Sequence, residues 1–478
     1  MDNHSKIAIL GFGTEGMAVL KYLKKHKYDN ITVCDRDVDL KKKMPDGVSV
    51  RLGKDYLNGL SDFDVVFRSP GIKYLDPLIQ SAKNRKEFSA GGGSQLKLGS
   101  PNGTDGLRVS ITSSTAFFLD QAPCKVIGVT GTKGKGTTAT LIYLMLKKAK
   151  KDVYLGGNIG DPAIEFLDKL KKTSFAVLEL SSFQLQDLEK SPHFAVLLNT
   201  TVDHLDYHVD RDEYLQAKES LLAHQGKNSL AVFNKDYEYV KYYLPLVKGE
   251  KKFVSVKGEV KDGAFTRNGG IFYAKSGKEE KIADVKEIAL IGSHNLENIL
   301  PAVAVAKEIG VETKDIRDVI KTFKGLPHRL EFVREVNGVK YYDDSVSTIP
   351  EPSMAAVDSF DVPTVLIAGG ASKGLSYDEW AVKILTKPSL TTVILIGQTA
   401  DEMESCLRDA WKKLGDAIGS PTKIIRCKTL EEAVKRASKE ASKGGVAVLS
   451  PAATSFDMFK NYKERGVKFV EAVGRLKG

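Results

Sequence analysis

Short apolar runs alternate with amphipathic stretches along most of the chain. Residues 6–10, 125–130 and 364–368 are apolar runs of strand length. Longer stretches, such as 139–148 and 459–473, have the mixed pattern of helices that cover a sheet. Strands that alternate with helices in this way predict an α/β protein whose sheets are mostly parallel.

Glycine-rich turns divide this pattern into three blocks. The first block spans residues 1–122, the second 123–325 and the third 326–478. A length of 478 residues also suits about three domains. Within the first block, residues 89–106 are polar and rich in glycine, and we expect a loop or hairpin without chemistry there.

Composition argues against a membrane or secreted protein. Hydrophobic residues make up 42% of the chain and charged residues 28%, as in ordinary globular proteins. No apolar run approaches the ~20 residues of a membrane span, and the N-terminus lacks the apolar region of a signal peptide. The four cysteines lie far apart, which predicts buried, unpaired thiols in a reducing compartment. We therefore expect a cytoplasmic protein.

The net charge of +10 raises the question of nucleic-acid binding. The lysines are scattered, with small groups at 41–43, 147–148 and 169–172, and no RNA-binding motif with interleaved aromatic residues occurs. A lysine-rich surface around sites for small anions explains the charge with fewer assumptions. We expect small-molecule substrates, with no nucleic acid and no membrane as partners.

The clearest chemical signal is a glycine-rich loop between a strand-like run and a helical stretch. The loop consists of Gly131, Thr132, Lys133, Gly134, Lys135 and Gly136, and it is followed by Thr137 and Thr138. Successive backbone N–H groups and a helix N-terminus form a cradle for polyphosphate. In such a cradle Lys135 would meet the β and γ oxygens, and Thr137 or Thr138 would offer a hydroxyl to magnesium. The spacing is shorter than the general Walker A pattern, but we prefer nucleotide binding to a tight turn without a ligand.

Two further polar groups follow strand-like runs in the second block. Glu179 ends the run 175–179, at the strand end where open α/β sheets place their ligands. A carboxylate there suits magnesium, although from the residues alone a capping or ion-pair role explains it equally well. His204 and His208 follow the run 194–198, but no glutamate or cysteine completes a helical zinc motif. We therefore expect no zinc.

These segments, with others in the same order along the chain, resemble the sequence elements of the Mur ligase family. The elements are Gly-Thr-Lys-Gly-Lys-Gly-Thr at 131–137, Gly-Asn-Ile-Gly at 157–160, Glu-Leu-Ser-Ser-Phe-Gln-Leu at 179–185, Asn-Thr-Thr-Val-Asp-His-Leu-Asp at 199–206, Ala-Lys at 217–218, His-Asn-Leu-Glu-Asn at 294–298, Pro-His-Arg-Leu-Glu at 327–331, Asp-Ser-Val-Ser-Thr at 344–348 and Ser-Pro-Ala-Ala-Thr-Ser-Phe-Asp-Met-Phe at 450–459. Apart from residues 89–105, the resemblance covers essentially the whole chain. Lys133, Gly136 and Val346 stand where the family carries Asn, Ser and Lys.

The resemblance implies a fold and a reaction. The implied fold has a Rossmann-like domain for a UDP-substrate at 1–122, a central P-loop ATPase domain with a mostly parallel sheet at 123–325 and a Rossmann-like domain for an amino acid at 326–478. The implied reaction is the ATP-dependent ligation of D-glutamate to UDP-N-acetylmuramoyl-L-alanine through an acyl-phosphate, a cytoplasmic step of peptidoglycan synthesis. ATP and two magnesium ions are the implied cofactors, and we expect a monomer.

The resemblance also assigns roles in the ATP half of the site. It implies that Lys218 is carbamylated, that Asn295 and Asn298 recognise adenine and that Asp344 contacts the ribose. Capping of the next helix by Ser293 or Asn295 is compatible with the same residues. The implied catalytic residues are Lys135, Glu179, His204, Lys218 and Arg329. The implied magnesium ligands are Thr137, Glu179, His204 and Lys218. The implied ATP contacts are Gly131, Thr132, Lys133, Gly134, Lys135, Gly136, Thr137, Asn295, Asn298, Arg329 and Asp344.

A Gly-x-Gly-x-x-Gly motif follows the first strand-like run, and Asp35 ends the next one. Such a motif on its own suggests NAD. Because a separate ATP loop follows it in the chain, we interpret it as the cradle for the UDP part of the substrate. The predicted contacts of this substrate are Gly11, Gly13, Thr14, Glu15, Gly16, Asp35, Arg36, Ser69, Pro70, Gly71, Asn158, Ser181 and His204.

The third block contains the amino-acid site that the resemblance implies. Thr348 and Lys373 would receive the α-carboxylate of glutamate, and Ser455 with the amide of Phe456 would bind its side-chain carboxylate, with Tyr462 nearby. From the residues alone, ordinary strand–helix turns are the simpler explanation of these loops. Val346 removes a cation that the family carries at this position, so L-glutamate stays open as the alternative to D-glutamate.

Three other classes of protein are less consistent with the chain. A folylpolyglutamate synthetase-type ligase does not need the N-terminal Gly-x-Gly-x-x-Gly domain. An NAD-dependent dehydrogenase would use that domain but not the second glycine-rich loop. A non-catalytic nucleotide-binding regulator would not need Glu179, His204 and Lys218 together.

Overall fold

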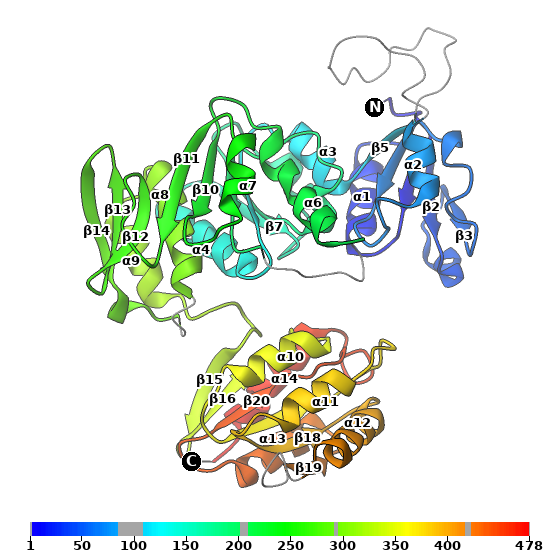
Figure 1. The fold of residues 1–478 in the computed structure, drawn as a ribbon. Coiled ribbons are helices and arrows are strands. Elements are labelled where there is room, and N and C mark those ends of the chain that lie inside the picture. The colour runs from blue at the N-terminus through cyan, green and yellow to red at the C-terminus, as the bar shows by residue number, and fades with distance from the viewer. Residues whose placement is uncertain (1, 85–108, 201–208, 291–294, 416–421, 478) are drawn as a thin grey trace. The chain divides into compact units, whose positions relative to one another are not determined.

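The computed structural model describes residues 2–84, 109–200, 209–290, 295–415 and 422–477. The chain forms two compact units, Met1–Phe323 and Lys324–Gly478, which we call unit 1 and unit 2. Unit 1 contains a five-stranded and a nine-stranded sheet, and unit 2 contains a six-stranded sheet (Figure 1). In the described residues, no helix is long and apolar enough to cross a membrane.

The first sheet of unit 1 is parallel throughout, with the strand order β3-β2-β1-β4-β5. Successive residues of each strand face opposite sides. Ile7 and Ile9 pack with helix α1, whereas Ala8 and Leu10 pack with α2 on the other side. This strand order is that of a Rossmann-like half-sheet. The elements are β1 (Ile7–Leu10), α1 (Thr14–Lys25), β2 (Ile31–Asp35), β3 (Val48–Leu52), β4 (Val65–Arg68), α2 (Pro77–Asn84), β5 (Ser110–Thr112) and α3 (Ser114–Gln121).

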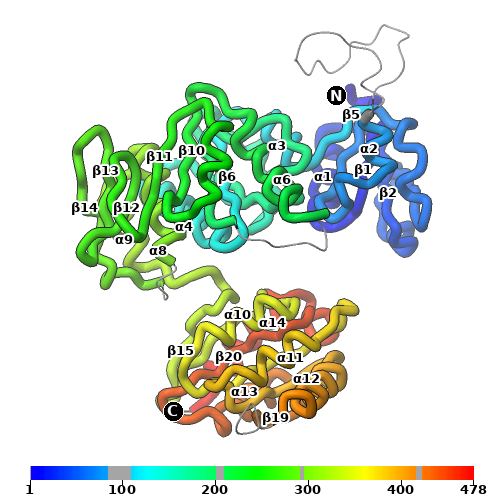
Figure 2. Tube along the Cα trace, viewed as in Figure 1, coloured from blue at the N-terminus to red at the C-terminus, as the bar shows by residue number. Residues whose placement is uncertain are grey.

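The second sheet has the order β14-β13-β12-β11-β10-β9-β6-β8-β7, in which only β12–β13 and β13–β14 pair antiparallel. Helix α4 lies beside α8 along this sheet (Figures 1 and 2). The strands are β6 (Lys125–Thr130), β7 (Val153–Gly157), β8 (Phe175–Glu179), β9 (Phe194–Leu197), β10 (Leu230–Asn234), β11 (Glu250–Ser255), β12 (Gly263–Arg267), β13 (Gly270–Lys275) and β14 (Lys278–Asp284). The helices are α4 (Lys135–Lys148), α5 (Ser182–Leu185), α6 (Arg211–Ala223), α7 (Val240–Tyr243), α8 (Leu296–Glu308) and α9 (Thr313–Thr322).

Unit 2 is built on a sheet with the order β15-β16-β20-β17-β18-β19, which is parallel except for the edge pair β15–β16. Helices α11 and α12 cover one face, and α13 and α14 cover the other. The strands are β15 (Glu331–Val336), β16 (Val339–Asp343), β17 (Thr364–Ala368), β18 (Leu390–Leu395), β19 (Lys423–Arg426) and β20 (Val446–Leu449). The helices are α10 (Pro350–Asp358), α11 (Asp378–Leu385), α12 (Ala400–Leu414), α13 (Leu430–Glu440) and α14 (Tyr462–Gly474).

The predicted α/β class with mostly parallel sheets is confirmed. The helix predicted at 459–473 begins later, at Tyr462, because the side chain of Asn461 caps it by accepting a hydrogen bond from the Glu464 N–H. Two of the predicted buried thiols, Cys34 and Cys124, are buried, but Cys406 and Cys427 are only half-buried. The domain bounds at 122 and 325 remain predictions.

Candidate functional site

The glycine-rich loop joins the end of β6 to the start of α4. Gly131 and Gly134 have φ angles of +151° and +84°, which side chains rarely tolerate. A Cβ on Gly134 would also lie 1.9 Å from the side-chain oxygen of Asn298. The loop therefore needs glycine at this position both for its backbone conformation and for the close approach of Asn298, which was predicted to recognise adenine.

The structure distinguishes the two threonines that follow the loop. Thr138 is fully buried, and its hydroxyl donates a hydrogen bond of 3.1 Å to the backbone oxygen of Asn298. Thr137, one position earlier on α4, is half-buried. Because Thr138 is committed to the contact with α8, Thr137 is the hydroxyl that suits a magnesium ion. The Nζ of Lys135 donates to the backbone oxygens of Gly131 and Thr132 at 3.0 Å each, so the lysine folds over its own loop.

The two predicted adenine contacts lie together at the start of α8. The side-chain amide of Asn298 donates a hydrogen bond of 2.8 Å to the side-chain oxygen of Asn295. Asn295 is the residue before the helix, but its side chain makes no capping hydrogen bond. The prediction that the Asn295 side chain caps this helix is therefore wrong. Ser293 lies outside the described residues.

Glu179 lies next to the glycine-rich loop because β8 pairs with β6. The pairing places Glu179 opposite Val129, close to the point where β6 enters the loop. The glutamate is 8% exposed and accepts a hydrogen bond of 3.2 Å from the side-chain amide of Asn158. The Asn158 N–H also donates to the Glu179 backbone oxygen at 2.9 Å. The turn predicted to touch the UDP-substrate thus holds the predicted magnesium ligand.

Lys218 is a buried residue of α6, with 1% exposure. Its Nζ lies 4.1 Å from the centre of the Tyr214 ring, one helical turn earlier. The Tyr214 hydroxyl lies 2.8 Å from the hydroxyl of Thr132 in the glycine-rich loop. Tyr214 therefore links Lys218 to the loop, a role that sequence analysis missed although the i, i+4 spacing signals a shared helix face. His204, His208 and the rest of 201–208 lie outside the described residues.

The Gly-x-Gly-x-x-Gly motif turns tightly between β1 and α1. The Phe12 N–H donates to a carboxylate oxygen of Asp35 at 2.7 Å, and the Ser69 hydroxyl donates to the Gly11 backbone oxygen at 2.7 Å. A Cβ on Gly16 would lie 2.2 Å from that same oxygen, whereas a Cβ on Gly13 would meet no described atom within 4 Å. Gly16 thus serves packing of α1 on β1, and Gly13 leaves its backbone open to a ligand. Arg36 is exposed, and Pro70 and Gly71 follow Ser69 on the same loop.

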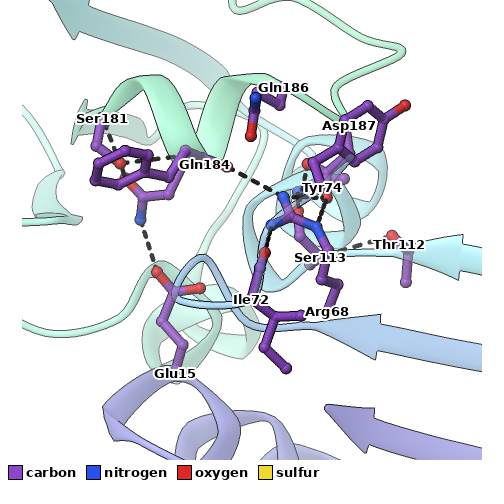
Figure 3. A network of polar contacts seen from close by, with 12 residues as sticks. Glu15, Arg68, Ile72, Tyr74, Thr112, Ser113, Ser181, Gln184, Gln186 and Asp187 are labelled. Atoms are coloured by element: carbon purple, nitrogen blue, oxygen red, sulfur yellow. Dashed lines mark hydrogen bonds and ion pairs between the residues drawn. The ribbon is translucent and has the colours of Figure 1, made fainter. Parts of the chain in front are cut away.

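A polar network connects this first sheet to the segment that follows Glu179 (Figure 3). Arg68 and Asp187 form an ion pair of 2.8 Å in which both side chains are buried. Arg68 also donates to the backbone oxygens of Ile72 and Phe183, at 2.7 and 3.1 Å. The loop that was predicted to contact the UDP part of the substrate and the segment after the predicted magnesium ligand Glu179 are therefore joined through one guanidinium group.

A second contact in this network involves a residue of the UDP cradle. The Gln184 side-chain amide donates to Glu15 at 2.7 Å, and Gln184 also forms a capping box with Ser181. Burial raises the pKa of the Glu15 carboxyl. Ser181 and Glu15 were predicted to contact the UDP-substrate, and Gln184 and Arg68 were missed because the sequence does not show which residues they meet.

The buried pair predicts a strong effect on stability. Arg68→Met should lower the free energy of unfolding by about 3–5 kcal/mol, because Asp187 would keep a buried charge without its partner. Lys25→Met is a matched control, since it removes an exposed ion pair with Asp168 and should cost less than about 1 kcal/mol. Urea unfolding followed by circular dichroism measures both. Equal losses for the two variants would contradict a stabilising role for the buried pair.

Unit 2 places several predicted residues at the carboxyl ends of its strands. Asp344 follows β16 and is buried, and its carboxylate accepts hydrogen bonds from the Ser450 hydroxyl at 2.6 Å, the Ser347 hydroxyl at 2.5 Å and the Leu330 N–H at 3.2 Å. The carboxylate thus bonds inside the unit. The ribose contact predicted for Asp344 stays a prediction.

The other predicted residues of unit 2 differ in exposure. Arg329 and Lys373 are exposed, Ser455 is buried and Phe456 is 72% exposed. Thr348 and Tyr462 are half-buried. The backbone oxygen of Tyr462 accepts a hydrogen bond of 2.8 Å from the Ser345 hydroxyl, and the Tyr462 ring packs edge to face against the His328 ring.

His328, Glu331 and Asp343 lie close enough together to hold a metal ion by spacing alone. His328 is 2.7 Å from Asp343 through Nδ1, and its backbone N–H donates to Glu331 at 2.8 Å. The hydrogen bond to Asp343 raises the pKa of His328. His328 pairs with Asp343, and Glu331 accepts the backbone N–H of His328, so these contacts use the three residues without a metal. We therefore assign them a structural role at the start of unit 2.

Burial of Asp344 predicts a dependence of stability on pH. Desolvation raises the pKa of Asp344 from 3.8 to about 6, despite the hydrogen bonds that it accepts. Well below pH 3.8 the carboxyl is neutral in both states, and well above pH 6 it is ionised in both, so this group lowers stability as pH rises from about 3 to about 7. The difference in unfolding free energy between wild type and Asp344→Asn should therefore shift by up to about 3 kcal/mol over that range in favour of the variant. Urea titrations at several pH values test this, and a constant difference would contradict it.

Comparison with known proteins gives two family matches. Residues 5–88 match the model described as Mur ligase MurD-like, N-terminal domain, and residues 129–306 match the Mur ligase middle domain. The chain is 38% identical over 479 residues to UDP-N-acetylmuramoylalanine–D-glutamate ligase of Acetivibrio thermocellus, covering 99% of this chain and 97% of that protein. The enzyme of the same name from Clostridium tetani is 34% identical, with the same coverage.

Solved structures resemble the fold at low sequence identity. UDP-N-acetylmuramate-alanine ligase MurC of Thermotoga maritima aligns with a TM-score of 0.55 at 17% identity, covering 99% of this chain and 100% of that one. MurF ligase of Thermotoga maritima, solved in complex with ADP, aligns with a TM-score of 0.53 at 18% identity, covering 99% and 96%. The three-sheet α/β architecture is therefore shared with these ligases.

Proposed function

The chain belongs to the Mur ligase family, and on that premise we propose that it joins D-glutamate to UDP-N-acetylmuramoyl-L-alanine with cleavage of ATP. One observation carries the proposal: the glycine-rich loop and Glu179 stand on the paired strands β6 and β8, in a chain 38% identical over nearly its full length to a D-glutamate ligase. The ligation is a step of peptidoglycan synthesis.

The first chemical step transfers the γ-phosphoryl group of ATP to the substrate carboxylate. A carboxylate is a poor nucleophile towards a polyanion, so cations must neutralise the γ-phosphoryl oxygens. A new O–P bond forms, the bond to the β-phosphate breaks and ADP leaves. We assign this neutralisation to Lys135 of the loop and to Arg329, with Asn295 and Asn298 on adenine.

The second step forms the amide. The amine of glutamate attacks the acyl carbon, the C–N bond forms as the C–O bond breaks, and phosphate leaves with its electron pair while the amine gives up a proton. The acyl-phosphate must be protected from water, because it hydrolyses easily. We assign the amino acid to Thr348, Lys373, Ser455 and Phe456, with Tyr462 beside them.

Magnesium fits the donor set around the loop. Glu179 offers a buried carboxylate and Thr137 a hydroxyl, both hard oxygen donors. Lys218 fits only as a carbamate, since an ammonium has no electron pair to offer a metal. His204 completes the proposed ligands. When bound, magnesium would neutralise charge on the phosphate oxygens.

The UDP part of the substrate is assigned to the first sheet. Gly11, Gly13 and Gly16 form the backbone cradle, with Thr14, Glu15, Asp35, Arg36 and the loop 69–71 around it, and Asn158 and Ser181 nearer the reacting carboxylate. This assignment is supported by the open backbone at Gly13. Domain bounds at 122 and 325, a monomeric state and a cytoplasmic location complete the proposal.

The deciding experiment measures ADP release with UDP-N-acetylmuramoyl-L-alanine and either enantiomer of glutamate. We expect turnover with D-glutamate. Because Val346 replaces a lysine of the family, the same assay with L-glutamate tests the second candidate, and a clear preference for L-glutamate would overturn the first. A change in nicotinamide absorbance without ADP release would instead support a dehydrogenase.

A further inference from the structure

Arg465 is a fully buried arginine in the first turn of α14. Its Nε donates to the Ser345 hydroxyl at 3.0 Å and its Nη2 to the Ser345 backbone oxygen at 2.9 Å. Its Nη1 donates to the backbone oxygens of Ala453 and Thr454 at 3.0 Å each. One side chain thus connects the loop after β16 to the loop after β20.

The loop after β17 joins the same contact. A Cβ on Gly370 would lie 2.0 Å from the Thr454 backbone oxygen and 3.0 Å from Nη1 of Arg465, so only glycine fits there. The Ala371 N–H donates to that oxygen at 2.9 Å, and the Thr454 hydroxyl donates to the Ala371 oxygen at 3.0 Å. Because β16, β20 and β17 are neighbours in the sheet, the three loops that follow their carboxyl ends converge on Arg465.

The hydrogen bonds of Arg465 go to neutral oxygen atoms rather than to a carboxylate. Burial lowers the pKa of the guanidinium to about 10, and Asp343, Asp344 and Asp457 counter this only from a distance. Burying an arginine in this way is costly compared with an apolar side chain of the same size. What the planar fork provides in return is a fixed geometry between several acceptors, which neither lysine nor an apolar residue offers.

We propose that Arg465 is a positioning residue for the amino-acid substrate. It holds the three loops in the arrangement that presents Thr348, Lys373 and Ser455 to the two carboxylates of glutamate. Thr348 lies three residues after Ser345, Lys373 three after Gly370 and Ser455 directly after Thr454. This inference rests on the proposed function, because it assumes that these loops receive glutamate in the second chemical step.

The test separates the glutamate step from the phosphoryl-transfer step. Arg465→Lys keeps the positive charge but loses the fork. Since misplacement of a substrate by about 1 Å costs up to about 100-fold, we expect KM for D-glutamate to rise between about 10-fold and 100-fold. Acyl-phosphate formation, trapped without glutamate as the hydroxamate by hydroxylamine, should stay within about twofold of wild type.

A matched control and a milder variant accompany the test. Arg475→Lys changes an exposed arginine at the end of α14, which pairs with Glu471 one turn earlier, and should leave every parameter unchanged. Ser345→Ala removes the acceptor of the Arg465 Nε together with the hydrogen bond to the Tyr462 backbone oxygen, and it should raise KM for D-glutamate less than Arg465→Lys. If Arg465→Lys does not fold, as judged by circular dichroism, Ser345→Ala carries the test.

Each outcome decides the matter. A raised KM for D-glutamate with intact hydroxamate formation supports the inference. An unchanged KM in folded Arg465→Lys, or in Ser345→Ala where the lysine variant does not fold, overturns it. A fall in hydroxamate formation that matches the fall in turnover, with KM for D-glutamate unchanged, also overturns it, because the arginine would then serve the ATP half. No hydroxamate with the wild-type enzyme would refute the proposed function itself, and this inference with it.

Discussion

Lys135→Ala should lower the rate of ADP formation about a thousandfold or more and leave binding of the UDP-substrate unchanged. Lys135 begins α4, directly after the glycine-rich loop, and its Nζ lies 3.0 Å from the backbone oxygens of Gly131 and Thr132. The lysine is thus held over the backbone that is proposed to cradle the phosphates. Removing a cation aimed at a charge that develops in the transition state costs on the order of 10²–10³ or more in rate.

Coupled ADP release measures the first quantity, and isothermal titration with the UDP-substrate measures the second. Lys147→Ala is the matched control, because Lys147 is an exposed lysine in the last turn of the same helix. The UDP part of the substrate is assigned to the first sheet, so the affinity for the substrate should stay within about twofold in both variants. Turnover of Lys135→Ala near the wild-type rate would show that the loop is not the ATP site.

The glycine-rich loop and Glu179 could be predicted from the sequence because their geometry is local. A strand, a glycine turn and a helix follow one another within residues 125–148, and the strand that carries Glu179 is contiguous. Alternation of strands and helices also sets the α/β class. These patterns predict strands, turns and helices, which form through hydrogen bonds within one segment or between neighbouring strands.

Contacts between distant segments could not be predicted in this way. Arg68 meets Asp187 across 119 residues, and Arg465 meets Ser345 across 120. Nothing in the periodicity around Arg68 or Arg465 shows which residue faces it, because that depends on how whole elements pack. From the residues alone the choice between Thr137 and Thr138 was left open for the same reason, since it depends on the position of α8 beside α4, and only the resemblance implied Thr137.

The burial of Lys218 is another feature that the sequence alone could not predict. In the sequence, this residue does not differ from a surface lysine, and its role came from family resemblance alone. The structure adds that the side chain is 1% exposed and that its Nζ faces the Tyr214 ring. Because the residue is buried, it is not a surface lysine. Burial of an ammonium group costs free energy. The burial is consistent with a group that is chemically modified and bound to metal.

Lys218→Ala should therefore lower activity about a thousandfold, and short carboxylic acids such as acetate should restore part of it. A carbamate forms when the lysine amine attacks carbon dioxide, and its role is that of an anionic oxygen ligand. The alanine variant leaves space next to Tyr214 in which a free carboxylate can take the same position. Steady-state rates at increasing acetate, compared with the same concentrations of chloride, measure the rescue.

Two further measurements separate the carbamate from a purely structural lysine. Wild-type activity should fall in buffer freed of carbon dioxide and return when bicarbonate is added, whereas a structural lysine would not respond. Lys227→Ala removes an exposed lysine just beyond the same helix and should neither lose activity nor respond to acetate. Full activity of Lys218→Ala without any carboxylate would dismiss the carbamate, and loss of activity without rescue or bicarbonate dependence would leave the ammonium over Tyr214 as the functional form.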